Sequence, residues 1–130
     1  MAFTPLLVSV EQAGTVRVVG VGGEVDIATA PALGAALGSG DDEADLVIDL
    51  SRTTFLDCEG LHLMLSAGEA QQAAGRGFAI ACRQGGEVAR MLALVAAEGL
   101  AELPIHRTRA AAIAAAQATP AAINSPQISA

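Results

Sequence analysis

The sequence predicts an α/β domain in which helices pack on a small mixed sheet. Three observations lead to this fold class. Short runs rich in Val, Ile and Leu recur along the chain at the length of buried strands. Segments with apolar residues three or four apart, as in amphipathic helices, alternate with these runs. The chain has 130 residues, of which 52% are hydrophobic, so we expect one domain with a substantial core.

The N-terminal part of the chain is predicted to begin with a hairpin. The apolar runs 6–10 and 15–21 flank Glu11-Gln12-Ala13-Gly14, a sequence that is typical of a hairpin turn. We expect Gly22-Gly23 to break the second strand, and residues 24–27 to continue or leave it.

A helix and a buried strand are expected next. Thr29 is the predicted N-cap of a helix over 30–37, and Pro31 lies in the first turn, where a missing N–H costs nothing. Leu33 and Leu37 give this helix one apolar face. The run 46–50 is typical of a strand that is buried on both faces.

The C-terminal half is predicted to continue with alternating helices and strands. In order, we expect a helix after Gly60 that ends near Gly75, a strand at 78–82, a helix at 87–97, a short strand or loop at 104–105 and an Ala-rich helix at 109–118. We interpret 1–118 as a single domain and 119–130 as a disordered C-terminal tail, because the tail has two prolines and few apolar anchors.

Charge and composition exclude several classes of function. The formal net charge is -7, and the seven basic residues, all Arg, are scattered along the chain. Without a basic patch, we expect no binding to nucleic acid or to an anionic membrane surface. The chain shows no signal peptide and no apolar run of membrane-spanning length, so we expect a cytoplasmic protein without membrane insertion.

Metal, cofactor and catalytic sites are not indicated by the sequence either. The two cysteines, Cys58 and Cys82, do not have the spacing of a zinc motif with His62 or His106. We recognise no nucleophile–base pair and no paired carboxylates, so we expect no enzyme activity, no cofactor and no metal.

The junctions between strands and helices are the best candidates for a functional site. Sites in α/β domains gather at the carboxyl ends of strands, which points to residues 24–29 and 57–60. Asp26 could orient the loop into the first helix. Asp57 could cap the second helix with a side-chain oxygen, which would place Cys58 near the positive end of the helix dipole.

Three segments together resemble the STAS domain, and in particular the bacterial anti-sigma factor antagonists. The segments are Gly23-Glu24-Val25-Asp26 with Thr29-Ala30-Pro31, then Leu46 to Ser51 with Phe55-x-Asp57-x-x-Gly60-Leu61, and finally Val88-x-Arg90-Met91-Leu92. The resemblance covers about residues 5–116. It implies a protein that binds an anti-sigma factor, usually also a serine kinase of the ATPase-fold type, and so releases a sigma factor. By the same resemblance, the partner-binding residues are Asp26, Thr29, Asp57, Cys58, Glu59, Gly60 and Leu61.

The chain departs from the family pattern at the phosphorylated position. Relatives carry Ser or Thr directly after the Asp, and a phosphate added there repels the partner by its charge. Here the residue is Cys58, which a Ser/Thr kinase cannot phosphorylate, and Glu59 follows it. Three interpretations stay open, in order of preference: a constitutively active antagonist, a negative-charge mimic through Glu59, and a redox switch. The switch would pair Cys58 with Cys82, because both are expected near the same edge of the sheet.

The sequence therefore leaves functions from two classes open. The first is an anti-sigma factor antagonist that acts by protein–protein binding. The second is a STAS subunit of a transport system, such as a lipid-transport ABC complex, with the same fold and a different partner. A nucleotide-binding STAS domain is a third interpretation, supported by the fold alone.

Overall fold

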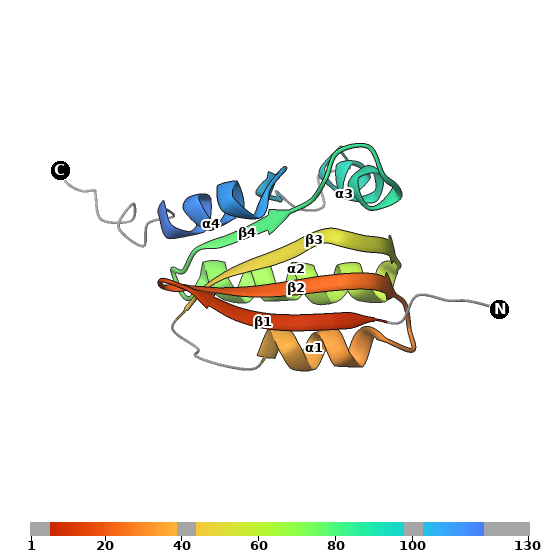
Figure 1. Cartoon of the computed structure of the whole chain (residues 1–130), viewed down its shortest axis with the longest axis horizontal. Helices are drawn as coiled ribbons and strands as arrows, with labels where there is room; N and C mark the ends of the chain where they lie inside the picture. Colours follow the sequence, from red (N-terminus) through yellow and green to blue (C-terminus); the bar gives the residue numbers. More distant parts are fainter. Residues whose placement is uncertain (1–5, 39–43, 98–102, 119–130) are drawn as a thin grey trace.

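The computed structural model describes residues 6–38, 44–97 and 103–118, which form one sheet covered by helices (Figure 1). The sheet has the strand order β1-β2-β3-β4-β5. In chain order the elements are β1 (Leu7–Ala13), β2 (Val16–Val25), α1 (Ala30–Gly38), β3 (Asp45–Leu56), α2 (Cys58–Ala73), β4 (Phe78–Ala81), α3 (Glu87–Ala97), β5 (Ile105–His106) and α4 (Arg109–Ala118). Only β1 pairs antiparallel with its neighbour, so the predicted α/β class with a mixed sheet is confirmed. The tail predicted at 119–130 lies outside the described residues.

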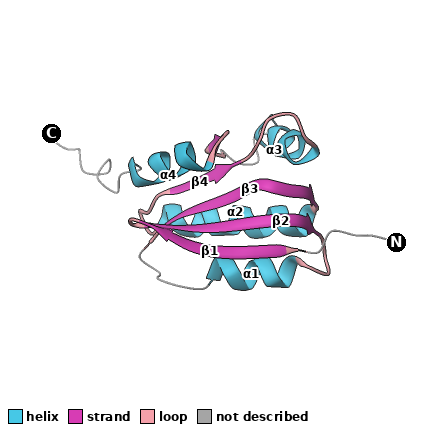
Figure 2. Cartoon of the chain, in the orientation of Figure 1, coloured by secondary structure: helices cyan, strands magenta, loops and turns pink. Residues whose placement is uncertain are grey.

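The hydrophobic core is divided between the two faces of the sheet. On one face, the central strands pack against α1, α2 and α3, whose Leu33, Met64 and Leu92 are fully buried. On the other face, Ala112 and Ala116 of α4 pack against β2, β3 and β4. Figure 2 shows α2 behind the sheet and α4 alongside β4. None of the helices in the described part of the chain is both long enough and apolar enough to cross a lipid bilayer.

β2 is continuous through the two glycines that were predicted to break it. The strand runs on to Val25, and its pairing with β3 shifts register between Gly20 and Gly22 and again between Gly23 and Glu24. Gly23 has a φ of 92°, which a residue without a Cβ adopts at little cost. The glycines therefore permit irregularities within the ladder and do not end it.

β3 is longer than the sequence predicted. It ends at Leu56 and not near residue 50, because residues 52–56 continue to pair with β2. The Thr53 hydroxyl donates to the Val21 carbonyl oxygen at 2.8 Å and reinforces this extension. Thr and Phe are common in strands, since their side chains suit a pleated surface. As a result, β2 and β3 end side by side, well beyond the end of β4.

Arg17 attaches α1 to the sheet from a buried position on β2. Only 7% of its surface is exposed. Its two terminal nitrogens donate to the carbonyl oxygens of Ala36 and Leu37, at 3.0 and 3.1 Å. These carbonyls belong to the last turn of α1, where a cation is favoured by the helix dipole.

Asp49 attaches α4 to the middle of the sheet. Its carboxylate accepts from the Ser51 N–H at 2.9 Å and the Ser51 hydroxyl at 2.6 Å, and from Arg109 Nε at 2.7 Å. Arg109 also pairs with Glu11 of β1. Burial raises the pKa of Asp49, but the hydrogen bonds from Ser51 and Arg109 outweigh burial and hold that pKa below its ordinary value. Asp49 is therefore charged in the folded protein at neutral pH.

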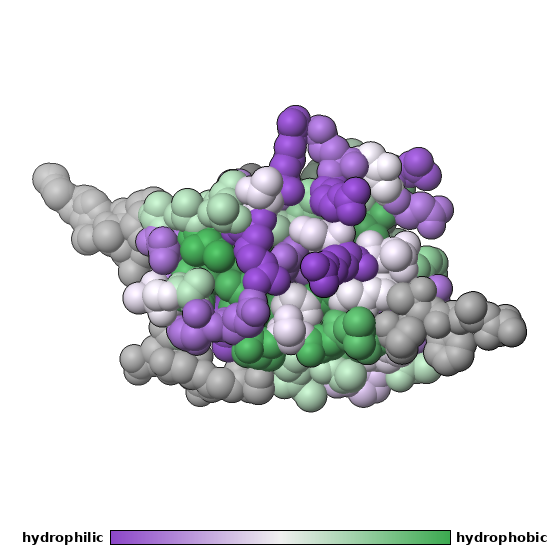
Figure 3. All heavy atoms as spheres, in the orientation of Figure 1, coloured by the Kyte–Doolittle hydropathy of each residue, from purple (hydrophilic) through white to green (hydrophobic). Residues whose placement is uncertain are grey.

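Polar and apolar residues are separated on the face of the molecule that carries α4. In the orientation of Figure 1, hydrophilic side chains gather across the middle of this face and around α3 (Figure 3). Apolar surface lies along the edge strand β1, whose Leu7 and Val10 are 67% and 47% exposed.

Candidate functional site

The two junctions that the sequence singled out meet at one edge of the sheet. Val25 and Leu56, the last residues of β2 and β3, are register partners. The Asp57 N–H extends the ladder by donating to the Val25 carbonyl oxygen at 3.0 Å. The loop after β2 and the start of α2 are thus fixed beside each other by backbone hydrogen bonds. The two segments that the sequence singled out therefore lie side by side, and their role as a functional site stays a prediction.

Asp26 organises the loop between β2 and α1. One of its carboxylate oxygens accepts from the backbone N–H groups of Ala28 and Thr29, at 2.9 and 3.0 Å. Its backbone carbonyl accepts from the Ala30 N–H at 2.7 Å and so satisfies a donor at the start of α1. The Thr29 backbone N–H lowers the pKa of Asp26 below its ordinary value, and burial opposes this only in part. Asp26 is therefore a charged residue whose hydrogen bonds hold the turn together.

Thr29 does not cap α1 with its hydroxyl, which corrects the predicted N-cap. The hydroxyl instead accepts from the Asp26 N–H at 2.8 Å. It also lies 3.0 Å from the Glu24 carbonyl oxygen and 3.1 Å from the Asp26 carboxylate, and it can donate its one proton to either. The reason is that the turn around Asp26 brings Asp26 and Glu24 close to Thr29. The hydroxyl therefore forms hydrogen bonds with these residues, which precede the helix, and not with backbone N–H groups of α1.

Ile27 projects from this turn and is the most exposed large apolar side chain of the described residues, at 76%. The sequence analysis did not select it. Phe55, the register partner of Glu24, is 42% exposed on the neighbouring strand and was not selected either. A bulky aliphatic residue inside a polar turn was the available signal for Ile27, because a turn gives such a side chain nothing to pack against.

Asp57 is the N-cap of α2, as the sequence predicted. Its backbone is extended, with φ −96° and ψ −174°, and its side chain accepts from the Gly60 N–H at 3.1 Å. The helix begins at Cys58, so Cys58 and Glu59 form its first turn, and both are exposed. Leu61, in the next position after Gly60, is half-buried and packs against the core.

Gly60 is the point at which α2 contacts both strand ends. A Cβ at this position would lie 2.5 Å from Leu56 Cδ1 and 2.5 Å from Val25 Cγ1. Non-bonded atoms do not approach so closely. Glycine at this position therefore allows the first turn of α2 to pack directly against the ends of β2 and β3. Among the partner-binding residues predicted from the sequence, Gly60 is buried, while Cys58 and Glu59 are exposed.

The register of β3 and β4 argues against pairing Cys58 with Cys82. Cys82 follows the last residue of β4, Ala81, which is level with Asp49 of β3. β3 then continues to Leu56 before Cys58, and six residues of strand beyond the level of Cys82 correspond to about 20 Å. Both thiols are free. Burial raises the pKa of Cys82, and the charge of Asp49 raises it further, so this thiol is protonated at neutral pH.

Four residues of the two junctions are exposed. They are Ile27, Ala28, Cys58 and Glu59, which together present two aliphatic side chains, one thiol and one carboxylate. Within the described ranges, no three His, Cys, Asp or Glu residues lie close enough to hold a metal ion. We refer below to residues 26–29 and 57–61 together as the junction surface.

Comparison with known proteins agrees with this fold. A model of the family described as Mlab, STAS domain matches residues 8–104, and the chain belongs to the STAS domain family. Two strains of Mycobacterium tuberculosis have a relative named anti-sigma-F factor antagonist RsfB, which is 39% identical over 66 residues. The match includes 49% of this chain and 54% of RsfB, so the chain spans about half the length of these curated relatives.

Solved structures give the same result over more of the chain. The crystal structure of an anti-sigma factor antagonist from Mycobacterium paratuberculosis is 32% identical, with a TM-score of 0.73, and the match covers 87% of this chain and 95% of that one. The structure of the Bacillus cell fate determinant SpoIIAA in its phosphorylated form is 17% identical, with a TM-score of 0.61. This match covers 83% of the present chain and 97% of the SpoIIAA chain. The second similarity shows the fold alone. The resemblance to anti-sigma factor antagonists that was predicted from the sequence is confirmed.

Proposed function

We propose that the protein is an anti-sigma factor antagonist that binds its partner through the junction surface and has no catalytic activity. The names of the mycobacterial relatives support this function, and they favour it over a subunit of a lipid-transport complex. The observation that carries the proposal is the backbone link between Asp57 and Val25, which holds both loops of the surface in one rigid arrangement. A rigid surface loses little conformational entropy when a partner binds.

The chemistry of the junction surface defines what the partner must offer. Ile27 is an exposed aliphatic anchor, and side chains of this kind contribute to binding when they enter an apolar pocket. Asp26, Asp57 and Glu59 add three carboxylates to the same surface. The complementary partner surface is an apolar pocket with a basic rim, and its charge would accelerate association.

Cys58 determines how such an antagonist is regulated. It is the first residue of α2 and is exposed, so a hydroxyl at this position would be accessible to a kinase. A thiol does not accept phosphate from a Ser/Thr kinase. We therefore assign the protein a constitutive antagonist activity with respect to phosphorylation, and this holds whether or not its anti-sigma factor is also a serine kinase of the ATPase-fold type.

The experiment that tests the function measures binding to the anti-sigma factors encoded in the same genome. Isothermal titration calorimetry should detect a complex with at least one of them. Ile27→Asp should weaken that complex about tenfold or more, because it replaces the apolar anchor by a charge. Leu94→Asp is the matched control, since Leu94 is 59% exposed on α3 and lies outside the junction surface. Absence of any complex, or equal weakening by both substitutions, contradicts the proposal.

A second experiment tests the regulation. The purified kinase is incubated with ATP and either wild-type protein or Cys58→Ser. We expect phosphate only in the variant, at residue 58, and loss of its binding to the anti-sigma factor once it is phosphorylated. Phosphorylation of the wild-type chain at another residue, with loss of binding, contradicts constitutive activity while leaving the function itself in place.

A further inference from the structure

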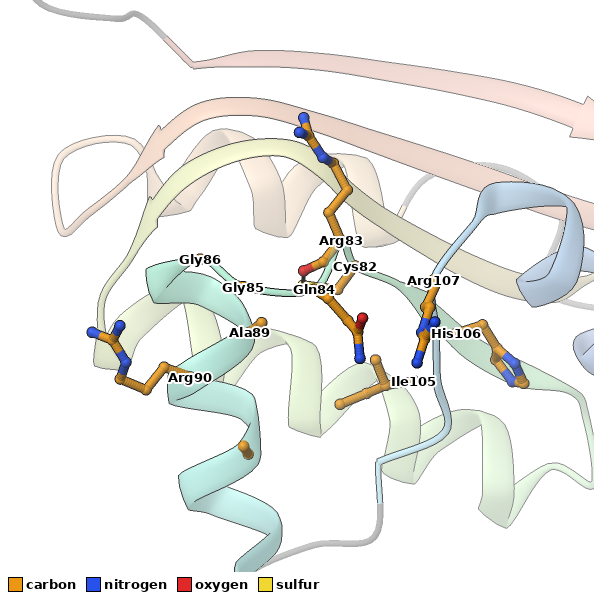
Figure 4. Close-up of a pocket in the computed structure, with 11 residues that line it drawn as sticks. Cys82, Arg83, Gln84, Gly85, Gly86, Ala89, Arg90, Ile105, His106 and Arg107 are labelled. Carbon is orange, nitrogen blue, oxygen red and sulfur yellow. Dashed lines mark hydrogen bonds between the residues drawn. The ribbon is translucent and has the colours of Figure 1, made fainter.

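A cavity opens at the carboxyl ends of β4 and β5, apart from the junction surface. Its volume is about 700 Å³, which is within the range of pockets for small molecules. Cys82 to Gly86 form one wall, α3 contributes a second wall, and Ile105 to Arg107 form a third. Figure 4 shows Gln84 lying between α3 and the segment that carries Ile105, His106 and Arg107. No residue of the junction surface lines this cavity.

The cavity concentrates positive charge in a protein that is otherwise acidic. Three of the seven arginines of the chain line it, namely Arg83, Arg90 and Arg107, together with His106. None of its lining residues is an Asp or a Glu. All three arginines are exposed, and the ion pairs found within the described residues involve Arg109 instead. Their guanidinium groups are therefore not neutralised by a described carboxylate, in a chain of net charge -7.

Apolar side chains complete the cavity. Ala89 and Ala93 of α3 face it, and Ile105, which is 38% exposed, lies opposite them. Gly85 and Gly86 leave the mouth open, because no atom lies within 4 Å of the position that a Cβ would take at either residue. The cavity thus combines apolar lining residues with exposed cations, and a few polar groups on an apolar wall are typical of ligand sites.

We propose that this cavity binds a small phosphorylated molecule that has an apolar body. Arginine is suited to the phosphate because its planar guanidinium donates two parallel hydrogen bonds to neighbouring phosphate oxygens. In Figure 4, Arg83 and Arg90 extend outward on different sides of the cavity. Each is a long exposed side chain without a described carboxylate partner, so it can turn toward an anion without breaking an ion pair. The apolar body lies against Ala89, Ala93 and Ile105.

Three probes separate the contributions of charge and apolar contact. Inorganic phosphate tests charge alone, benzyl alcohol tests apolar contact alone, and phenyl phosphate combines them. In titrations followed by amide chemical shifts, phenyl phosphate should bind about tenfold more tightly than inorganic phosphate. Its shifts should be confined to residues 82–93 and 105–107, and added salt should weaken its binding. Shifts scattered over the surface, or no saturable binding of phenyl phosphate, overturn the proposal.

Substitutions show whether the cavity arginines are responsible. Arg107→Ala and Arg90→Ala should each weaken phenyl phosphate binding about fivefold or more, as expected for the loss of a charge-assisted hydrogen bond. Arg52→Ala is the matched control, because it removes the same charge from an exposed position on β3 that does not line the cavity. Unchanged thermal unfolding would show that each variant is folded. Equal weakening by Arg52→Ala identifies non-specific attraction and overturns the proposal.

Discussion

Val25 and Leu56 are register partners at the ends of two parallel strands, and the side chains of both lie against Gly60. The Val25 carbonyl also accepts the N–H of the residue that caps α2. One pair of aliphatic residues therefore fixes the relative position of the two loops that form the junction surface. The stability of this corner and the geometry of the junction surface depend on the same contacts.

Gly60→Ala should destabilise the fold. The added methyl group would lie 2.5 Å from Leu56 Cδ1 and from Val25 Cγ1, so the helix start or both strand ends must move. Overpacking of this kind costs about 1–3 kcal/mol in the free energy of unfolding, which urea denaturation would measure. The shift of α2 should also weaken binding of the proposed partner.

Gly34→Ala is the control for this substitution. Gly34 lies within α1, and its added Cβ would meet Leu63 at 3.7 Å, an ordinary contact distance. Alanine has the higher helix propensity, so the variant should be equally stable or more stable by up to about 1 kcal/mol. If both variants lose the same stability, close packing at Gly60 is not the cause.

The sequence sufficed to predict the order of the elements, and it failed where pairing between strands overrides local signals. Gly22-Gly23 has the local signature of a strand end, yet the neighbouring β3 holds these residues in the ladder through two register shifts. Residues 52–56 were not recognised as strand, because their pairing partners lie about thirty residues earlier in the chain. Long-range pairing of this kind leaves no periodic pattern in a short window of sequence.

The candidate site was also predictable only in part, where local sequence signals mark its residues. Asp26 and Asp57 each follow a strand, and the parallel order of β2 and β3 places them at one edge. Ile27 was missed because the motif drew attention to the charged residues around it. The cavity beside α3 was missed because its arginines come from three separate segments, and Gly85-Gly86 alone is no phosphate-binding motif.

Two substitutions at Asp57 separate its capping role from its charge. Asn is as good an N-cap as Asp, so Asp57→Asn should keep the stability of α2, whereas Asp57→Ala should lose about 1 kcal/mol. If the charge of Asp57 contributes to partner binding, Asp57→Asn should weaken the complex without a change in unfolding. Equal stability of the two variants would contradict the importance of the hydrogen bond to the Gly60 N–H.

The two thiols should react at very different rates. Cys58 is exposed, whereas Cys82 is buried and has a raised pKa. Brief treatment of the native protein with iodoacetamide at neutral pH should therefore give one adduct, at Cys58, as identified by mass spectrometry of peptides. Cys58→Ser should give none under the same conditions. A peptide that joins Cys58 to Cys82 after mild oxidation would contradict the separation described above.

Asp49→Asn should destabilise the protein at neutral pH. The substitution replaces the carboxylate by a neutral amide. If the amide nitrogen takes the place of the oxygen that accepts from Arg109 Nε, two donors face each other; if the amide oxygen does, the hydrogen bond remains but the ion pair is lost. Because Asp49 is almost fully buried, we expect a loss of about 1–3 kcal/mol in the free energy of unfolding. Glu69→Gln removes the same charge from an exposed position on α2 and should change stability by less than about 0.5 kcal/mol.

The difference in stability between the wild type and Asp49→Asn should itself depend on pH. The folded protein holds the pKa of Asp49 below its ordinary value of 3.8, so the charged form stabilises the fold. That contribution is fully present above the ordinary value and declines as the pH falls through the lower pKa of the folded state, because the unfolded chain takes up the proton first. Urea denaturation at neutral pH and near pH 3 measures the difference, and other carboxylates largely cancel between the two proteins. The gap should narrow in acid. A gap that is constant, or that widens in acid, would show that Asp49 stabilises the sheet by shape and not by its charge.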